Sequence, residues 1–197
     1  MPRIGQERKG QRRRQILDAA WRCATRMGFH DMTVDDVCTE AGLSKGAFYG
    51  YFAQKRDLLL ALFEDDGQRL DELMDELYER VDGSRDRLRA YTRAVLARSE
   101  ETGRVQVRAD MWTTMLTEPE VREAFAASMQ ARRVRLRSWV EDAVATGELV
   151  EIPANAFASI LLALTDGLLL HGSLDPAGFR WINISKALDL LLEGVSR

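Results

Sequence analysis

The stretch that decides the fold is residues 33–52, which reads TVDDVCTEAGLSKGAFYGYF. It begins with Thr33, and two acidic residues, Asp35 and Asp36, follow in the first turn of a short apolar-periodic segment. A threonine before such a segment is typical of a helix N-cap, and carboxylates in the first turn suit the helix dipole. Gly42 then ends the segment, because glycine lets the backbone reverse without a Cβ clash. The pattern predicts a short helix and a tight turn.

A second short helix follows that turn, capped by Ser44 and running through Phe48 towards Phe52. The apolar residues at the corner between the two helices are Val37, Ala41, Leu43 and Phe48. This is the pattern of a helix-turn-helix, in which the second helix enters the major groove of DNA. The second helix starts with the small or basic residues Ser44, Lys45, Gly46 and Ala47, which allow its backbone to come close to the bases.

The charge of the chain is unevenly distributed. The net charge of the 197 residues is −3, but residues 1–56 hold 11 Lys/Arg and 6 Asp/Glu, a balance of +5, and leave −8 for residues 57–197. Such asymmetry indicates that one part of the chain meets an acidic partner, although a basic N-terminal run is often only a solvated tail.

Composition excludes several classes of protein. With 46% hydrophobic and 30% charged residues, the chain is neither disordered nor collagen-like, and two cysteines exclude a disulfide scaffold. The basic N-terminal residues are not followed by an apolar run, so there is no secretory signal, and we expect a cytoplasmic protein with reduced thiols.

The apolar spacing is helical almost throughout, and period-two alternation is hard to find. It predicts an all-α fold of about nine helices. Besides the two short helices, the expected segments are residues 12–27, 54–81, 88–99, 105–116, 121–145, 157–174 and 180–195.

The residues flanking the helix-turn-helix make the pattern more specific. R-x-x-I-L-x-A-A at residues 13–20, Gly28-Phe29, Thr33, AGLSKGAFYGYF at 41–52, Lys55 and Asp57-Leu58-Leu59 together resemble the DNA-binding domain of the TetR family, the tetracycline-repressor-like regulators. The resemblance covers residues 12 to about 62. It implies an all-α homodimer with a three-helix DNA-binding head at 1–56 and a ligand-binding and dimerisation body at 57–197.

The resemblance also implies roles for individual residues. Thr33 caps the second helix and contacts phosphate, Lys45 and Gly46 face base edges, and Lys55 is a further phosphate contact. Tyr49 and Tyr51 lie where tyrosines of the family bind the DNA backbone, whereas Gly50 replaces the bulkier residue often found between them. The set of DNA-binding candidates is Thr33, Ser44, Lys45, Gly46, Ala47, Tyr49, Gly50, Tyr51 and Lys55. We expect residues 1–11 to form a mobile basic arm, and Arg12, Arg13 and Arg14 either to contact DNA or to stay solvated.

Two C-terminal segments carry more apolar surface than one core needs. Residues 156–174 are apolar enough to suggest a membrane span, but Asp166 and His171 lie inside, and charge at mid-membrane is costly. Burial against both the chain's own core and a partner is the better interpretation, and it predicts a homodimer; packing within one chain is the alternative. The interface candidates are Leu161, Leu168, His171, Trp181, Ile184, Leu188, Leu191 and Val195.

The middle helices carry aromatic and methionine side chains, which make adaptable apolar pocket walls. The candidates for a small-molecule pocket are Tyr91, Met111, Trp112, Met115, Phe125, Met129 and Trp139, with plain core packing as an equal alternative for each. The family resemblance implies a small-molecule effector, whose binding would change the separation of the two heads.

The sequence offers no pattern for catalysis or for a metal or other cofactor. Cys23 and Cys38 are fifteen residues apart without a CxxC, and the chain has only two histidines, His30 and His171. No nucleophile elbow or strand-borne phosphate loop is present. We therefore predict a dimeric, ligand-responsive regulator that binds a palindromic double-stranded operator and represses transcription. A DNA binder without sequence preference, and a helical interaction protein or small enzyme, are the alternatives.

Overall fold

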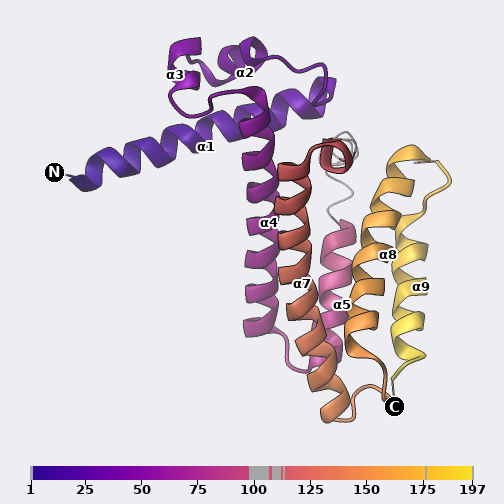
Figure 1. Ribbon diagram of the computed structural model, residues 1–197. Coiled ribbons are helices and arrows are strands. Elements are labelled where there is room, and N and C mark those ends of the chain that lie inside the picture. Colours follow the sequence, from indigo (N-terminus) through magenta and orange to yellow (C-terminus); the bar gives the residue numbers. More distant parts are fainter. Residues whose placement is uncertain (1, 98–106, 108–111, 113, 176, 197) are drawn as a thin grey trace. The chain divides into compact units, whose positions relative to one another are not determined.

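The structure is a computed structural model, and it describes residues 2–97, 107, 112, 114–175 and 177–196. These residues are almost entirely helical (Figure 1), which confirms the all-α prediction. The helices are α1 (Pro2–Met27), α2 (Val34–Ala41), α3 (Lys45–Tyr49), α4 (Lys55–Arg80), α5 (Ser84–Ala97), α7 (Pro119–Ala145), α8 (Ala154–Leu174) and α9 (Trp181–Glu193). Most of the segment 105–116, expected as a further helix, lies outside the described residues.

Helix α1 is longer than the sequence pattern predicts. Residues 2–11, expected as a mobile arm, are helical and continue directly into the rest of α1. The helical conformation has a local reason, because Gln6, Glu7, Arg8 and Lys9 are good helix formers and Pro2 suits a first helical position. The mobility expected of residues 1–11 stays a prediction.

The chain forms two compact units. The first comprises Met1–Asp66 and Gln106–Ala124, and the second comprises Gly67–Val105 and Phe125–Arg197. The units divide inside α4, after Asp66, and inside α7, after Ala124. The domain boundary expected after residue 56 stays a prediction.

The first unit is built on α1, which packs against α2, while α2 packs against α3. Apolar residues at three- and four-residue spacing along α1 supply the core of this unit, and the aromatic residues of the helix-turn-helix close it. The buried side chains include Ile16, Leu17, Ala20, Ala24, Phe29, Val37, Phe48, Phe52, Leu58 and Leu62.

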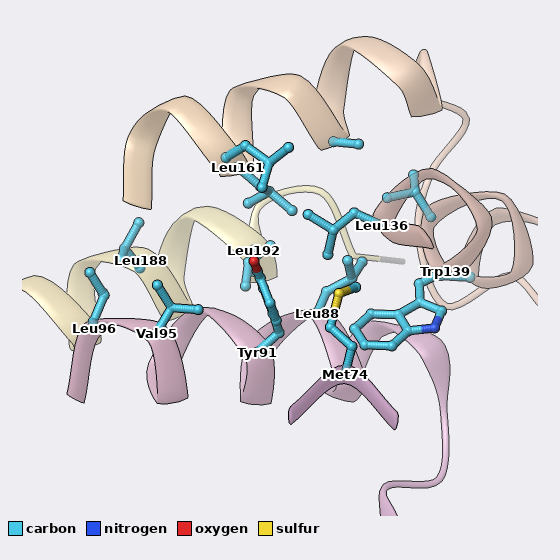
Figure 2. Close-up of a cluster of buried hydrophobic side chains, with 14 of the residues drawn as sticks. Met74, Leu88, Tyr91, Val95, Leu96, Leu136, Trp139, Leu161, Leu188 and Leu192 are labelled. Atoms are coloured by element: carbon cyan, nitrogen blue, oxygen red, sulfur yellow. The ribbon is translucent and has the colours of Figure 1, made fainter. Parts of the chain in front are cut away.

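The second unit has its own hydrophobic core, in which α5 packs against both α8 and α9 (Figure 2). Tyr91 of α5 lies edge-on to Trp139 of α7, with 6.4 Å between their ring centroids. Leu88, Leu136, Leu161, Leu188 and Leu192 contribute aliphatic side chains from four helices. Each such side chain contributes about 1.5–3 kcal/mol when it leaves water, so this cluster is the main source of stability for the unit.

Helix α8 is the one described helix that is long and apolar enough to cross a membrane, over Ala154–Gly172. Length and composition alone are weak evidence, because the core helix of a soluble protein passes the same test. Leu161, Leu162 and Leu169 of this helix are buried in the core of the second unit, so one face of α8 is occupied by the chain itself.

Candidate nucleic-acid interface

The start of α2 is fixed by a reciprocal pair of hydrogen bonds. The Thr33 hydroxyl accepts from the Asp36 backbone N–H over 3.2 Å, and the Asp36 carboxylate accepts from the Thr33 N–H over 2.8 Å. The hydroxyl also donates to Asp36 Oδ2 over 2.6 Å. Hydrogen bonds from the Thr33 side chain and backbone hold the pKa of Asp36 below its ordinary value. Because the Thr33 hydrogens are already engaged, a phosphate contact by this side chain would have to replace a bond to Asp36.

The turn between the two short helices depends on one glycine and one serine. Gly42 has φ 63° and ψ 40°, and its N–H bonds to the carbonyls of Cys38 and Thr39. This left-handed conformation is open to glycine at no steric cost. Ser44 then caps α3 by accepting from the Ala47 N–H over 3.2 Å. The turn therefore fixes α3 in a single orientation against α2.

Helix α3 has one buried face and one exposed face. Phe48 is 1% exposed, and its ring centroid lies 5.6 Å from that of Phe52. On the other side Lys45 and Gly46 are exposed, and Tyr49 is 52% exposed. Tyr49 stands edge-on to Phe48 at 5.5 Å, which orients its ring while its hydroxyl stays accessible. The exposed face presents the side chains that the sequence predicted for DNA contact.

Lys45 is held by a carboxylate at the start of α2. Its Nζ lies 2.8 Å from Asp35 Oδ1, and that hydrogen bond raises the lysine pKa above its ordinary value. Both side chains are more than half exposed. Since exposed pairs contribute only about 0–1 kcal/mol, Lys45 can exchange Asp35 for a base or phosphate at little cost.

Tyr51 and Gly50 line a shallow groove together with the N-terminal half of α1. The other lining residues are Lys9, Gly10 and Arg13. Arg13 also lies 5.6 Å from the Phe52 ring centroid and 3.4 Å from Glu64 Oε2. Two cationic side chains and a phenol around one groove form a surface to which a phosphate can bind.

Lys55, at the first position of α4, is engaged within the chain. Its Nζ donates to the His30 carbonyl over 2.9 Å and lies 4.7 Å from the Phe29 ring centroid. Burial lowers the pKa of this ammonium. Lys55 therefore ties the start of α4 to the turn before α2, and its expected phosphate contact stays a prediction.

The start of α4 is also paired with residues near the start of α7, inside the first unit. Arg56 Nη1 lies 3.4 Å from Glu118 Oε2, and the same guanidinium pairs with Glu120. This connection was not predicted, because nothing in the spacing of residues 56 and 118–120 shows that they meet.

The three arginines at residues 12–14 make contacts within the chain, and the DNA contacts considered for them stay a prediction. Arg14 pairs with the buried Asp65 of α4, and Arg12 Nη1 donates to Gln15 over 2.9 Å. Arg14 therefore holds the first unit together, and Arg13 alone of the three lines the groove beside Tyr51.

The interface candidates divide into core and surface. Leu161 and Leu188 are 4% and 6% exposed and pack in the core of their own chain, and their part in an interface stays a prediction. Leu168, Trp181, Ile184 and Val195 are partly buried against the same core, while His171 is exposed and Leu191 is 65% exposed. Further large exposed side chains of α8 and α9, which were not among the interface candidates, are Ile160, Leu174, Ile182 and Leu190.

The pocket candidates lie mostly in packed positions. Tyr91 and Trp139 are core residues of the second unit, and Phe125 and Met129 are half-buried in the same unit. Met115 is buried and Trp112 is 38% exposed, both in the first unit. Met111 lies outside the described residues. Their role as pocket walls stays a prediction. Within the described ranges, no group of three or more His, Cys, Asp or Glu side chains could hold a metal ion.

An exposed face that carries Lys45 and Tyr49 on the second helix of a helix-turn-helix, in an all-α chain, is typical of a DNA-binding protein. Residues 16–62 match the family described as bacterial regulatory proteins, tetR family, and residues 84–193 match the BetI-type transcriptional repressor, C-terminal family. The chain therefore belongs to the TetR family of transcriptional regulators. It is a DNA-binding transcriptional repressor, and its relatives are regulators.

Individual proteins give the same picture over nearly the whole chain. The HTH-type transcriptional repressor Rv1474c of Mycobacterium tuberculosis is 26% identical over 208 residues, covering 100% of both chains. The structure of Salmonella enterica GusR superposes with a TM-score of 0.76 at 27% identity and covers 93% of this chain and 94% of that one. A transcriptional regulator from Saccharomonospora viridis, solved in complex with choline, has a TM-score of 0.82 at 22% identity, covering 95% and 100%. At that identity the last similarity shows the fold alone.

Proposed function

We propose that the protein is a cytoplasmic homodimer that binds a palindromic operator by placing α3 in the major groove. The observation that carries the proposal is the division of α3 into a buried Phe48 and an exposed Lys45 and Tyr49. Lysine can read the O6 and N7 acceptors of guanine, while a tyrosine hydroxyl can donate to a phosphate oxygen. Gly46 has no side chain, so the backbone at this point of α3 can approach the base edges closely.

The groove beside Tyr51 supports a phosphate contact that fixes the register of α3. Lys9 and Arg13 lie on successive turns of α1, and Gly50 lines the same groove without contributing a side chain. A phosphate bound here would be neutralised by two cations and would carry no sequence information, which is the role of a positioning contact.

The exposed apolar residues of α8 and α9 support dimerisation through these two helices. Ile160, Ile182, Leu190 and Leu191 are each between 59% and 68% exposed. Large aliphatic side chains are costly to leave in water, and exposed apolar surface of this kind marks protein interfaces. Two heads on one face of DNA then require half-sites whose centres are about 34–36 Å apart.

Effector binding would release the operator by favouring an arrangement of the dimer that DNA cannot accept. Arg56, at the start of α4, pairs with Glu118 and Glu120 at the start of α7, so a displacement of residues 118–120 acts directly on the helix that follows the DNA-binding motif. A hundredfold loss of operator affinity needs about 2.7 kcal/mol of coupling.

The proposal is tested by in-vitro selection from random duplex DNA at about 150 mM salt, where specific and non-specific binding separate. An enriched palindrome with half-sites about one helical turn apart is the expected result. An affinity that depends on salt concentration, with no sequence enriched, would instead indicate a non-specific DNA binder. The Lys45→Ala variant, selected in parallel, shows whether the enriched site depends on α3.

A further inference from the structure

Helix α7 carries one charged residue at a position where its neighbours are apolar and buried. Its core-facing side runs through Met129, Leu136, Trp139 and Ala143 at three- and four-residue spacing, and Arg132 occupies the place between Met129 and Leu136. Arg132 is only 6% exposed. All of these residues belong to the second unit.

Among the described residues, the Arg132 guanidinium has only weak acceptors. Nη2 donates to Ser128 Oγ over 3.3 Å and to Met129 Sδ over 3.4 Å, while Nε is buried without an acceptor. No carboxylate in the described part of the chain forms an ion pair with it. Arg135, three residues further along, differs in this respect because it pairs with Asp71 and Asp75 of α4.

Helix α4 passes close to Ser128 at a residue that has no side chain. Gly67 is the residue that faces it, and a Cβ built there would lie 3.3 Å from Ser128 Oγ, the same atom that accepts from Arg132. Because Gly67 has no side chain, α4 brings neither a carboxylate nor a bulky group to Ser128 at this position.

A buried cation that lacks a counter-charge is expensive, by several kcal/mol for an arginine in apolar surroundings. An apolar side chain of similar length would fill the same place without that cost. The arginine is therefore useful only when something supplies the missing negative charge.

We propose that Arg132 binds the carboxylate of an effector that has an apolar body, with the Ser128 hydroxyl as a second donor. The guanidinium fork fits a carboxylate with two parallel hydrogen bonds, and Met129 and the half-buried Phe125 on the same side of α7 suit an apolar chain. This inference rests on the proposed ligand-responsive function and adds the chemical class of the effector.

The test uses the full-length protein without DNA, with decanoate as the probe and decanol as its uncharged counterpart. Decanoate is expected to raise the thermal unfolding midpoint of the wild type in proportion to ligand occupancy, while decanol has little effect. Arg132→Met should abolish the decanoate shift and should itself unfold at the same or a higher temperature, because it removes an uncompensated buried charge. Arg137→Met is the matched control, since Arg137 lies on the same helix, is 42% exposed and pairs with Glu141.

Equal decanoate shifts in the wild type and in Arg132→Met, or no shift in the wild type, would overturn the proposal. So would a large loss of stability in Arg132→Met, which would show that the guanidinium serves the fold. Operator binding by the same preparations is measured separately. If the operator is bound but decanoate is not, the anion site fails and the proposed function stands; if no DNA sequence is selected, the proposed function fails whatever decanoate does.

Discussion

The indole N–H of Trp21 donates to Asp65 Oδ2 over 3.1 Å, and this bond joins the middle of α1 to α4 inside the first unit. Both residues are buried, with 4% exposure each, and the other Asp65 oxygen accepts from Arg14. One carboxylate thus satisfies a buried indole and pairs with a half-exposed guanidinium. The orientation of α1 against α4 depends on it.

Replacing Asp65 with alanine should destabilise the protein by about 1–3 kcal/mol, the cost of leaving a buried donor unsatisfied. Denaturant unfolding followed by tryptophan fluorescence measures this change. Glu64→Ala is the control: the neighbouring Glu64 is 64% exposed and pairs with the partly exposed Arg13, so its loss should be nearly neutral. Equal stabilities of the two variants would contradict this role of Asp65.

Tyr49→Phe should weaken binding to every DNA sequence by a similar factor, because the hydroxyl is expected to donate to a phosphate. A lost hydrogen bond of about 1 kcal/mol corresponds to roughly fivefold in affinity. The contact of the ring with Phe48 is kept, so unfolding should not change. Tyr78→Phe is the matched control, since Tyr78 is equally exposed at 59% but lies in the second unit. Fluorescence anisotropy with the selected site and with a scrambled duplex gives both affinities.

Lys45→Ala should lower the affinity for the selected operator and relax the preference at one base position in each half-site. Asp35→Asn should act in the opposite direction on affinity, because it frees the Lys45 ammonium and removes a negative charge from the DNA-facing side of α2. Repeating the selection with each variant measures both effects. Lys186→Ala, an exposed lysine of α9, controls for general loss of positive charge. An unchanged selected sequence for Lys45→Ala would remove this lysine from base recognition.

Leu191→Glu should give a folded monomer, whereas Leu188→Glu should not fold. The two leucines lie on the same helix, but Leu191 is 65% exposed and Leu188 is 6% exposed and packed in the core of its own chain. Light scattering reports the mass and circular dichroism the helix content of each variant. A Leu191→Glu protein that stays dimeric would place the interface elsewhere than on this side of α9.

The contribution of Glu40 to stability should depend on pH in a defined direction. Hydrogen bonds from Arg22 and then Arg26 hold the Glu40 pKa below its ordinary value of 4.5. A lowered pKa in the folded state means that the stabilisation is complete above pH 4.5 and is lost as the pH falls through the folded-state value. The gap in unfolding midpoint between the wild type and Glu40→Gln should therefore be widest near neutral pH and close in acid. A gap that widens in acid would mean that folding raises the Glu40 pKa, which would contradict this prediction.

The local chemistry of the helix-turn-helix could be predicted from residues 33–52. Thr33, Gly42 and Ser44 occupy the helix caps and the turn that the sequence indicates, since these positions are set by neighbours within four residues. The exposure of Tyr49 follows equally, because burying Phe48 leaves the next residue on the other face of a helix.

Contacts between distant segments could not be predicted in the same way. The pairs of Asp65 with Trp21 and of Arg56 with Glu118 depend on how helices pack, which no short-range pattern records. A partial signal existed, because the leucine pattern of α4 is interrupted between Leu62 and Leu70, where buried Asp65 lies. Similarly, Leu188 and Leu191 are both leucines of one apolar helix, and only the packing separates core from surface.

The brevity of α3 limits how much sequence one head can distinguish. The helix spans only Lys45–Tyr49, one of those residues is Phe48 in the core, and Gly46 and Ala47 have no hydrogen-bonding side chains. With each bidentate base contact worth about 1–3 kcal/mol, a single head falls short of the roughly 4–10 kcal/mol that separates a regulatory site from random sequence. The remaining free energy of discrimination must come from the bending and groove width of the DNA, and from a second head that binds the other half-site. The operators of this protein should therefore resemble one another more closely in symmetry and DNA shape than in base sequence.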